Sequence, residues 1–303
     1  MNSAEGPPDQ EDGSSYDRAA DVFRELGDPT RVEIIATLVE AQRAGDGPLS
    51  FAELRRRLDV RDSGRFNYHL KQLQPRFVES VEDGYQTRYA GMMAYNLVRA
   101  GAAPRESMEL EEHSTRPCLL CDESPVARYV SDRVTLTCET YGEQIMGIPV
   151  PPEVAKDRTL EGILDFAEVN SWQQLSLALE GFCPYCWGPI GYELEKTEPS
   201  SDLEIPEEFE PPVQLHITCE RCNHTFNIPL RLAISRHPAV TCFHYDRGID
   251  LSTKDLFGTF SALQVDEEFA DSDGGAWIRF EIEGDTLTVE VDEQIQVTAV
   301  DSG

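Results

Sequence analysis

The sequence predicts an α+β protein of two or three domains, because 303 residues are enough for more than one hydrophobic core. Three observations predict this class. Apolar residues recur at helical spacing over residues 16–100, alternating apolar and polar residues mark hairpins in the rest of the chain, and all eight cysteines lie beyond residue 117. The expected order is a helical N-terminal domain, then cysteine-held β units, then a small α+β C-terminal region.

The chain is strongly acidic, with 56 Asp and Glu residues against 26 Lys and Arg and a net charge of −30. Only four of the basic residues are lysines. Many carboxylates and few lysines are typical of proteins that stay soluble in very high salt, where the screening length falls to about 3 Å at 1 M and self-repulsion costs little. A halophilic surface is therefore the favoured interpretation, and an acidic face for a basic partner is the alternative.

The charge is unevenly distributed. Residues 1–15 hold four acidic and no basic residues, and residues 16–100 hold 13 of each. Residues 101–303 hold 39 acidic and 13 basic residues, which gives them a net charge of −26. Within residues 50–76 the basic residues outnumber the acidic ones. The N-terminal part of the chain therefore contains its one locally basic stretch.

The N-terminal elements follow from local signals. Residues 1–15 are polar and rich in Gly, Pro and Ser, so we expect a disordered tail. A first helix is expected over residues 16–27, and Asp28 and Pro29 begin a second one as N-cap and first-turn proline. A Ser-x-x-Glu capping box at residues 50–53 predicts a third helix.

A fourth helix is expected over residues 63–73, with the first of these residues as its N-cap. Phe66, Leu70 and Leu73 fall at positions i, i+4 and i+7, so they should point inward. His69 lies next to this apolar stripe, and we expect it to be packed or to act as a cap.

The next segment, residues 77–90, alternates and carries Asp83-Gly84, a hairpin signal. A closing helix is expected over residues 90–101. Helix, helix, helix–turn–helix, hairpin and helix is the element order of a winged helix-turn-helix domain, which we place over residues 16–103.

Residues 16–100 resemble the ArsR-type winged-helix regulators that are abundant in halophilic archaea. The motifs that carry the resemblance are LGDPTRVEIIATL, LSFAELRRRL, SGRFNYHLKQL and the hairpin. The resemblance implies a transcriptional regulator that binds double-stranded DNA as a homodimer through its first and last helices, residues 16–27 and 91–100. Many such regulators sense metals through cysteines in the third helix; FAELRRRL has none, which excludes sensing of that form.

The outward side of the fourth helix suits the major groove. Arg and Lys can donate to guanine, Asn and Gln can pair with adenine, and Tyr can contact a thymine methyl group or a phosphate. The candidate base-reading residues are Arg65, Asn67, Tyr68, Lys71 and Gln72. The candidate backbone contacts are Arg55, Arg56 and Arg57 in the third helix, and Tyr85, Thr87 and Arg88 in the hairpin.

Two features favour a different use of the winged helix, as a protein-binding surface. Glu82 and Asp83 place carboxylates at the hairpin tip, where phosphates would lie. Counterion release is also a weak driving force when the salt is already molar. A DNA-binding protein in such salt must rely more on direct base and groove contacts, which the polar side of the fourth helix could supply.

Two C-x-x-C pairs, Cys183 with Cys186 and Cys219 with Cys222, are separated by 32 residues. Four thiolates give the tetrahedral geometry that Zn²⁺ prefers in closed structural sites. Disulfides are disfavoured in an intracellular chain. The sequence therefore predicts a zinc ribbon over residues 183–222, with a structural Zn²⁺ and a long acidic loop.

A second ribbon-like unit begins at Cys118 and Cys121, but its expected second pair is reduced to Cys138, with Tyr141 at the partner position. One interpretation, which we favour, is a degenerate ribbon that has lost its metal. The other is a second Zn²⁺ site whose fourth ligand comes from elsewhere in the chain. The candidate donors are His113, His216 and Cys242, although Cys242 in its apolar helix is most simply a core residue.

The rest of the chain, beyond residue 103, is expected to form two regions that differ in composition. Residues 104–152 are expected to hold a linker and the degenerate ribbon-like unit, and residues 153–303 an α+β region that contains the zinc ribbon. A helix over residues 158–180 is either continuous or broken near Asn170-Ser171. Residues 195–212 form an acidic, Pro-rich loop, and a further helix ends at Gly248.

The C-terminal segment reads as β structure. Residues 277–291 alternate on both sides of a tight turn and predict a hairpin, with Ile278, Phe280 and Ile282 facing Leu287, Val289 and Val291. Residues 294–300 are a candidate third strand.

The sequence contains no P-loop, G-x-S-x-G or G-x-G-x-x-G motif, and we expect no enzyme. His237, His244, Asp246 and Asp250 cluster in one segment and could suggest a hydrolase. His237 with Pro238 is better explained as the start of a helix, and Asp246 followed by Gly248 as its end. No apolar run approaches the roughly 20 residues of a membrane span, and no signal-peptide pattern opens the chain, so a cytoplasmic protein is expected.

Two functions remain. The first is a DNA-binding transcriptional regulator with a zinc-stabilised C-terminal region for dimerisation, sensing or partner contact. The second is a non-enzymatic zinc-ribbon adaptor whose winged helix binds protein. The sequence does not identify an operator, a regulated gene, an effector or the sign of regulation.

Overall fold

The structure is a computed structural model that describes residues 12–101, 108–121, 123–196, 212–253, 258–259, 263, 265–269 and 275–303. The chain forms two compact units, Met1–Arg105 (unit 1) and Glu106–Gly303 (unit 2). Both combine helices with antiparallel strands, which confirms the α+β class. No helix in the described part of the chain is long and apolar enough to cross a membrane.

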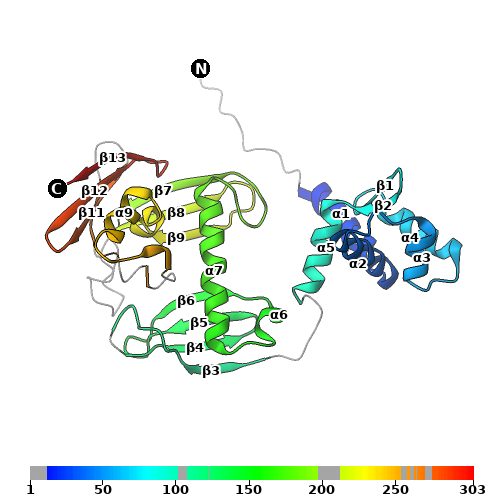
Figure 1. The fold of residues 1–303 in the computed structure, drawn as a ribbon, viewed down its shortest axis with the longest axis horizontal. Helices are drawn as coiled ribbons and strands as arrows, with labels where there is room; N and C mark the ends of the chain where they lie inside the picture. Colours follow the sequence, from blue (N-terminus) through cyan, green and yellow to red (C-terminus); the bar gives the residue numbers. More distant parts are fainter. Residues whose placement is uncertain are drawn as a thin grey trace, which may run out of the picture. The chain divides into compact units, whose positions relative to one another are not determined.

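Unit 1 is mainly helical (Figure 1). Its elements are α1 (Asp12–Leu26), α2 (Pro29–Ala44), α3 (Phe51–Arg57), α4 (Ser63–Leu73), β1 (Val78–Val81), β2 (Gly84–Thr87) and α5 (Tyr89–Arg99). The caps expected for α2 and α3 are present: Asp28 Oδ1 accepts from the Thr30 N–H at 2.9 Å, and Ser50 Oγ accepts from the Glu53 N–H at 3.2 Å. Local sequence signals therefore fix where α2 and α3 begin, and these are helices against which α4 packs.

Two expected boundaries are corrected. Of the expected tail, residues 1–11 lie outside the described residues, but residues 12–15 belong to α1, which begins four residues earlier than Tyr16. The N-cap of α4 is Asp62 rather than Ser63, because Asp62 Oδ1 accepts from the N–H groups of Gly64 at 2.9 Å and Arg65 at 3.0 Å.

The core of unit 1 is built where α2, α3, α4 and the β1–β2 hairpin meet. Phe66, Leu70 and Leu73 of α4 are buried in it, as their spacing predicts. His69 is buried beside them, with its Nδ1 3.7 Å from Asp28 Oδ1. One side of α4 is therefore fixed in the core, and the opposite side is presented to solvent.

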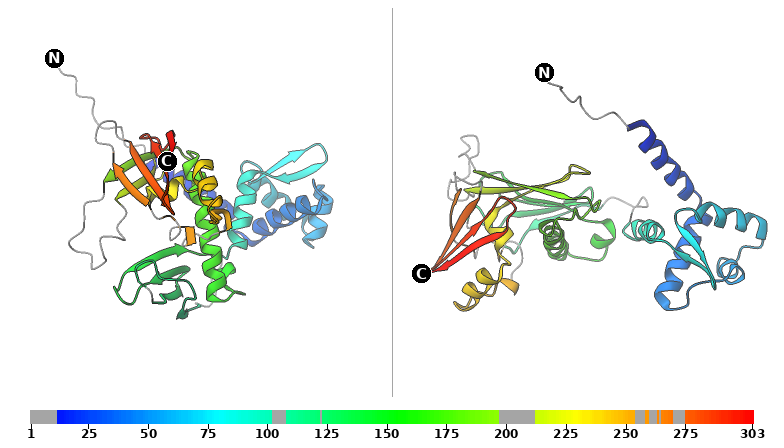
Figure 2. Two further views of the ribbon diagram at one scale, coloured as in Figure 1. Left: turned by 60° about the vertical axis from the view of Figure 1, so that its left-hand side comes forward. Right: turned by 90° about the horizontal axis from the view of Figure 1, so that it is seen from above.

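Unit 2 contains three separate antiparallel sheets (Figures 1 and 2). The first, in the order β3-β4-β5-β6, is formed by Leu110–His113, Val126–Val130, Arg133–Thr137 and Gln144–Pro149. The second, in the order β7-β8-β9, is formed by Ile190–Lys196, Val213–Cys219 and Thr225–Pro229. The third, in the order β10-β11-β12-β13, is formed by Val265–Phe269, Ala276–Ile282, Asp285–Val291 and Val297–Ser302.

The helices of unit 2 are α6 (Pro152–Ala155), α7 (Leu160–Leu179), α8 (Leu230–Ile234) and α9 (Pro238–Tyr245), with a short 3-10 turn, η2 (Leu251–Thr253). The long helix α7 packs on two sheets in turn. Ile163, Leu164 and Ala167 lie in the core of the first sheet, whereas Trp172, Leu175 and Ala178 lie in that of the second. One rigid element thus joins the two sheets.

The break considered near Asn170-Ser171 does not occur. The helix continues through both residues, and Ser171 Oγ donates to the Ala167 carbonyl at 2.8 Å. A serine that bonds to the preceding turn is compatible with a continuous helix, so it gave no reliable signal for a break.

The predicted C-terminal hairpin is confirmed as β11 and β12, in which Ile278 pairs with Val289 and Phe280 with Leu287. The candidate third strand is present as β13, paired with β12. Most of the expected acidic loop, residues 197–211, lies outside the described residues. The expectation that Cys242 is a core residue is wrong: α9 buries Val240, Phe243 and His244, and Cys242 is exposed.

Candidate functional site

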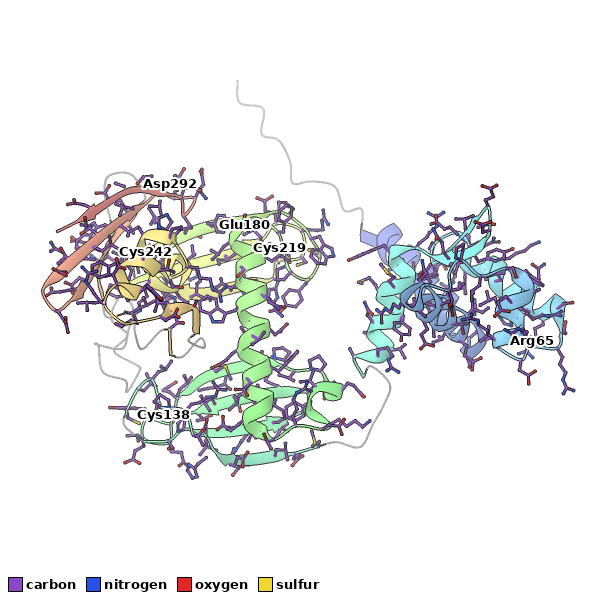
Figure 3. The ribbon with its side chains drawn as sticks, viewed as in Figure 1. Arg65, Cys138, Glu180, Cys219, Cys242 and Asp292 are labelled. Carbon is purple, nitrogen blue, oxygen red and sulfur yellow. The ribbon has the colours of Figure 1, made fainter. Side chains whose placement is uncertain are left out.

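The exposed side of α4 carries four of the five candidate base-reading residues. Arg65, Tyr68, Lys71 and Gln72 are exposed, and Asn67 is half-buried. Tyr68 keeps 59% of its surface accessible although it is a large aromatic residue. In Figure 3, Arg65 lies at the outer edge of unit 1. The helix therefore presents two cations, two amides and a phenol to solvent.

The three arginines of α3 differ in their partners. Arg56 donates twice to Glu53, at 2.9 and 2.7 Å, and Arg57 donates to Glu53 at 2.9 Å and to Asp46 at 3.2 Å. The hydrogen bonds from Arg56 and Arg57 lower the pKa of Glu53 to about 2. These two arginines are already neutralised locally, whereas Arg55 has no carboxylate partner among the described residues.

One cation at this surface was not among the candidate contacts. Arg61, in the turn between α3 and α4, is exposed and forms no ion pair in the described part of the chain. Its signal in the sequence was its position: it directly precedes the Asp62 cap of α4. Together with Arg55, Arg65 and Lys71 it forms the group that we call the α3–α4 cations.

The hairpin candidates are only partly available. Tyr85 is half-buried on the core, and its backbone forms a two-way bridge with Leu49, at 2.9 and 3.1 Å. Arg88 is exposed and lies 3.7 Å from Glu79. Thr87 offers little surface for the predicted contact: it is 7% exposed, and its N–H and Oγ1 both donate to Gln42 Oε1. Gln42 lies 45 residues away, so no local signal could reveal this pairing.

The hairpin also turns one residue earlier than the Asp-Gly signal suggested. Val81 pairs with Gly84, which leaves Glu82 and Asp83 as the two exposed turn residues. Gly84 has φ +143°, and a Cβ there would lie 2.3 Å from the Leu49 carbonyl oxygen. The glycine is therefore needed for the close passage of β2 past Leu49, and two carboxylates form the hairpin tip.

The predicted metal ligands of the zinc ribbon are brought together. The Sγ atoms of Cys183, Cys186, Cys219 and Cys222 all lie within 4.8 Å of one another. The Cys183–Cys222 and Cys186–Cys219 distances are 3.8 and 3.5 Å. Tetrahedral ligands with Zn–S bonds of about 2.3 Å would place their sulfurs about 3.8 Å apart, so this four-cysteine cluster has the size that Zn²⁺ requires.

The electrostatics of the four-cysteine cluster also fit a cation. Burial opposes ionisation of Cys219, but hydrogen bonds from the backbone N–H groups of Cys222 and Arg221 and from nearby thiols outweigh it and lower its pKa to about 6. The His224 N–H favours the thiolate of Cys222, yet neighbouring thiols and burial raise the pKa of Cys222 to about 12. Crowded thiols cannot all ionise unless a positive charge lies between them.

The second set of candidate ligands is also assembled. The Sγ atoms of Cys118, Cys121 and Cys138 lie within 4.8 Å of one another, with 3.5 Å between Cys121 and Cys138. Among the described residues no His, Cys, Asp or Glu completes this three-cysteine cluster. The proposed donor His216 instead bonds Glu195 at 2.8 Å and Asn227 at 2.9 Å in the second sheet. His113 and Cys242 do not join the cluster.

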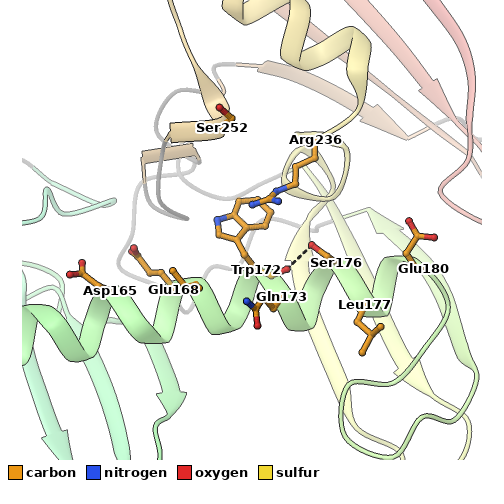
Figure 4. Close-up of a pocket in the computed structure, with 10 residues that line it drawn as sticks. Asp165, Glu168, Trp172, Gln173, Ser176, Leu177, Glu180, Arg236 and Ser252 are labelled. Carbon is orange, nitrogen blue, oxygen red and sulfur yellow. Dashed lines mark hydrogen bonds between the residues drawn. The ribbon is translucent and has the colours of Figure 1, made fainter. Parts of the chain in front are cut away.

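A pocket of about 820 Å³ lies along α7 and was not foreseen from the sequence (Figure 4). Its wall includes Trp172, and the Arg236 guanidinium lies 4.4 Å from the centre of that ring. Asp165, Glu168 and Glu180 add carboxylates along the same helix. The sequence offered no signal for this pocket, because its residues come from α7, from the turn that follows α8, and from η2.

Each of the two units of the chain matches the model of a protein family. Residues 19–98 match the model of a domain of unknown function, DUF7347, and residues 115–297 match that of another, DUF7351. The comparisons with curated proteins and with solved structures find no match. The DUF7351 match covers more than half of the 303 residues of the chain, so the chain belongs to the DUF7351 family.

Proposed function

We propose that the protein is a DNA-binding transcriptional regulator, in which unit 1 acts as a winged helix-turn-helix and α4 enters the major groove. The observation that carries this proposal is the exposed side of α4. It gathers Arg65, Lys71 and Gln72 around an exposed Tyr68, in the one locally basic stretch of a chain whose net charge is −30. These side chains are those that read base edges.

The α3–α4 cations support the same assignment. Arg55, Arg61, Arg65 and Lys71 all lie on α3, on α4 or in the turn between them, and none has a carboxylate partner among the described residues. In an acidic protein, a cation without a local partner is available to a phosphate. Arg56, Arg57 and Arg88 have carboxylate neighbours, so we assign them weaker backbone contacts.

The anchoring of α4 supports the precision that base reading needs. Phe66, Leu70 and Leu73 are fully buried, and Asp62 caps the first turn with two hydrogen bonds. A helix held along one whole side keeps its outward side chains in a fixed register. Base recognition depends on such a register, since one wrong base pair costs only about 1–3 kcal/mol.

A homodimer through α1 and α5 is part of the proposal. Of the 14 large apolar residues that are exposed in the described chain, six lie on these two helices. They are Phe23, Tyr89, Met92, Met93, Leu97 and Val98. Exposed apolar residues in this number on the first and last helices of a DNA-binding domain suit contact with a second copy of the chain, and two copies would match a two-fold symmetric site.

The four-cysteine cluster is assigned a structural Zn²⁺. Cys183 and Cys186 lie just before β7, whereas Cys219 ends β8 and Cys222 precedes β9, so the ion would tie together the two cysteine loops at one end of the second sheet. Four thiolates leave no open position, and the contribution expected of such an ion is to folding. The pocket along α7 is the candidate site for an effector.

A protein-binding adaptor is the second candidate, and Glu82 and Asp83 favour it because their exposed carboxylates would repel phosphates. The two functions are separated by selecting duplexes from a random pool with the full-length, zinc-loaded protein in molar KCl. A regulator enriches one sequence motif. If no motif is enriched over several rounds, the DNA-binding proposal is overturned in favour of the adaptor.

A further inference from the structure

Three cysteine loops of unit 2 share one geometry, including one that holds a single cysteine. In the loops 183–188 and 219–224, the N–H of the first cysteine donates to the carbonyl of the fifth residue after it, at 2.9 Å in both. The Cys138 N–H donates in the same way to the Glu143 carbonyl, at 2.8 Å. The loop 138–143 is therefore closed like the two loops of the four-cysteine cluster.

The backbone conformation agrees. The fourth residue after the first cysteine has a left-handed φ in all three loops: Trp187 at +60°, Asn223 at +56° and Gly142 at +70°. A non-glycine residue rarely adopts this conformation, so its recurrence at one position marks a specific loop and not a chance similarity. By this alignment Tyr141 occupies the position of Cys186 and Cys222.

The other half of the three-cysteine cluster also matches. The Leu120 N–H donates to Cys118 Sγ at 3.3 Å, as the Arg221 N–H donates to Cys219 Sγ at 3.4 Å. Cys121 precedes β4 as Cys186 precedes β7, and Cys138 follows β5 much as Cys219 ends β8. In Figure 3, Cys138 and Cys219 lie at the first and second sheets of the unit.

We propose that the three-cysteine cluster is a second Zn²⁺ site, held by Cys118, Cys121 and Cys138, whose fourth coordination position takes an exchangeable ligand from solvent. The three sulfurs are already within ligand distance, and the described chain offers no His, Cys, Asp or Glu to complete the tetrahedron. Three protein ligands with one open position distinguish reactive zinc sites from closed structural ones.

The surroundings favour an open position. Thr140 Oγ1 lies 3.4 Å from Cys121 Sγ and can hydrogen-bond a sulfur, but a neutral hydroxyl is not among the usual protein ligands of Zn²⁺. Cys118 and Cys121 are only half-buried, so solvent can approach the cluster. The four-cysteine cluster thus has a structural role, whereas this site exchanges its fourth ligand. This inference does not depend on whether unit 1 binds DNA.

The test is a titration of the metal-free, full-length protein with Co²⁺, followed by its d–d and thiolate-to-metal bands. We expect two bound ions per chain, the second with a weaker thiolate band than the first. Imidazole, a neutral ligand for an open position, should shift the d–d bands of the second ion only. Tyr141→Cys supplies the missing thiolate, so its second ion should gain intensity and no longer respond to imidazole.

Cys121→Ser is the matched loss variant and should bind one ion. It replaces a half-buried cysteine and not the buried Cys138, and circular dichroism checks that it folds. The proposal is overturned if the unmodified protein binds one ion while Tyr141→Cys binds two, since the site would then have lost its metal. It is equally overturned if both bind one ion, or if the second ion of the unmodified protein ignores imidazole.

Discussion

Arg116 and Glu168 form an ion pair that is almost entirely buried in unit 2. Arg116 Nη1 lies 2.7 Å from Glu168 Oε1, and the two side chains are 8% and 3% exposed. Glu161 and Asp165, on the same side of α7, also bind the guanidinium, at 3.3 and 2.7 Å. Because Arg116 lies two residues before Cys118, this pair holds the start of the three-cysteine cluster against α7.

Removing the arginine should destabilise unit 2 strongly. Arg116→Met leaves the buried Glu168 carboxylate without its ion-pair partner, and such a change costs about 3–5 kcal/mol. Denaturant unfolding, followed by tryptophan fluorescence, measures the loss, because all three tryptophans of the chain lie in unit 2. Arg128→Met removes an exposed pair with Glu111 and should cost no more than about 1 kcal/mol. Equal losses in both variants would contradict a special role for the buried pair.

The buried His244 should make unit 2 sensitive to acid. Burial lowers its pKa below the ordinary value of 6.5, and its Nδ1–H donates to the Val240 carbonyl at 2.8 Å. Below pH 6.5 the unfolded chain binds a proton that the folded chain resists. The free energy of unfolding should therefore fall with decreasing pH, by at most about 1.4 kcal/mol per pH unit from this residue.

The check is to compare the unmodified protein with His244→Phe between pH 5 and pH 7. Phe fits among the neighbours of His244, which include Phe243 and Phe280. The variant should lose part of the pH dependence. Taking the difference between the two profiles removes the effect of acid on the cysteine clusters, which is common to both proteins. Parallel profiles would show that His244 does not titrate as described.

Gly84→Ala should distort the hairpin. The new Cβ would lie 2.3 Å from the Leu49 carbonyl oxygen, and φ is +143°, a value that L-residues rarely adopt. We expect unit 1 to lose about 1–3 kcal/mol of stability. Gly64→Ala, whose Cβ would meet only Asp62 Oδ1 at 3.4 Å, is the control and should be nearly neutral. Thermal unfolding of the two variants distinguishes backbone strain from the general effect of losing a glycine.

A polar residue on the exposed side of α5 should weaken the proposed dimer. Leu97 is 56% exposed, so Leu97→Asn has little effect on the core of unit 1 but removes apolar area from the exposed side of α5. Sedimentation equilibrium should show a larger dissociation constant for this variant. Val300→Asn changes a similarly exposed residue of β13 and should have no effect. A monomeric unmodified protein would refute the dimer.

The sequence predicted elements best where local chemistry decides them. Asp28 and Ser50 cap the helices they were expected to cap, and the spacing of Phe66, Leu70 and Leu73 identified the inward side of α4. Cys242 was misplaced because apolar composition alone does not say which side of α9 is buried. Its neighbours Val240, Phe243 and His244 take the inward positions, and Cys242 falls opposite them.

The sequence could not predict contacts between segments that are far apart in the chain. Thr87 is buried by Gln42, and Arg116 is held by carboxylates 45 and 49 residues further on. The pocket at Trp172 likewise depends on three elements meeting. The loop at Cys138 is an intermediate case. The spacing from Cys138 to Gly142 equals that from Cys219 to Asn223 and is visible in the sequence, but only the backbone shows that the loops close alike.

The most direct test of DNA reading by α4 uses the duplex motif that the selection yields. Binding of the full-length protein is compared with that of Arg65→Ala, Asn67→Ala and Lys71→Ala, with Lys156→Ala as the control that removes one positive charge from unit 2. Arg65→Ala and Asn67→Ala should each lose about 1–3 kcal/mol of preference for the motif over a scrambled duplex. Lys71→Ala should weaken binding, and Lys156→Ala should leave it unchanged. If the three α4 variants all keep the preference and the affinity of the unmodified protein, α4 does not read DNA.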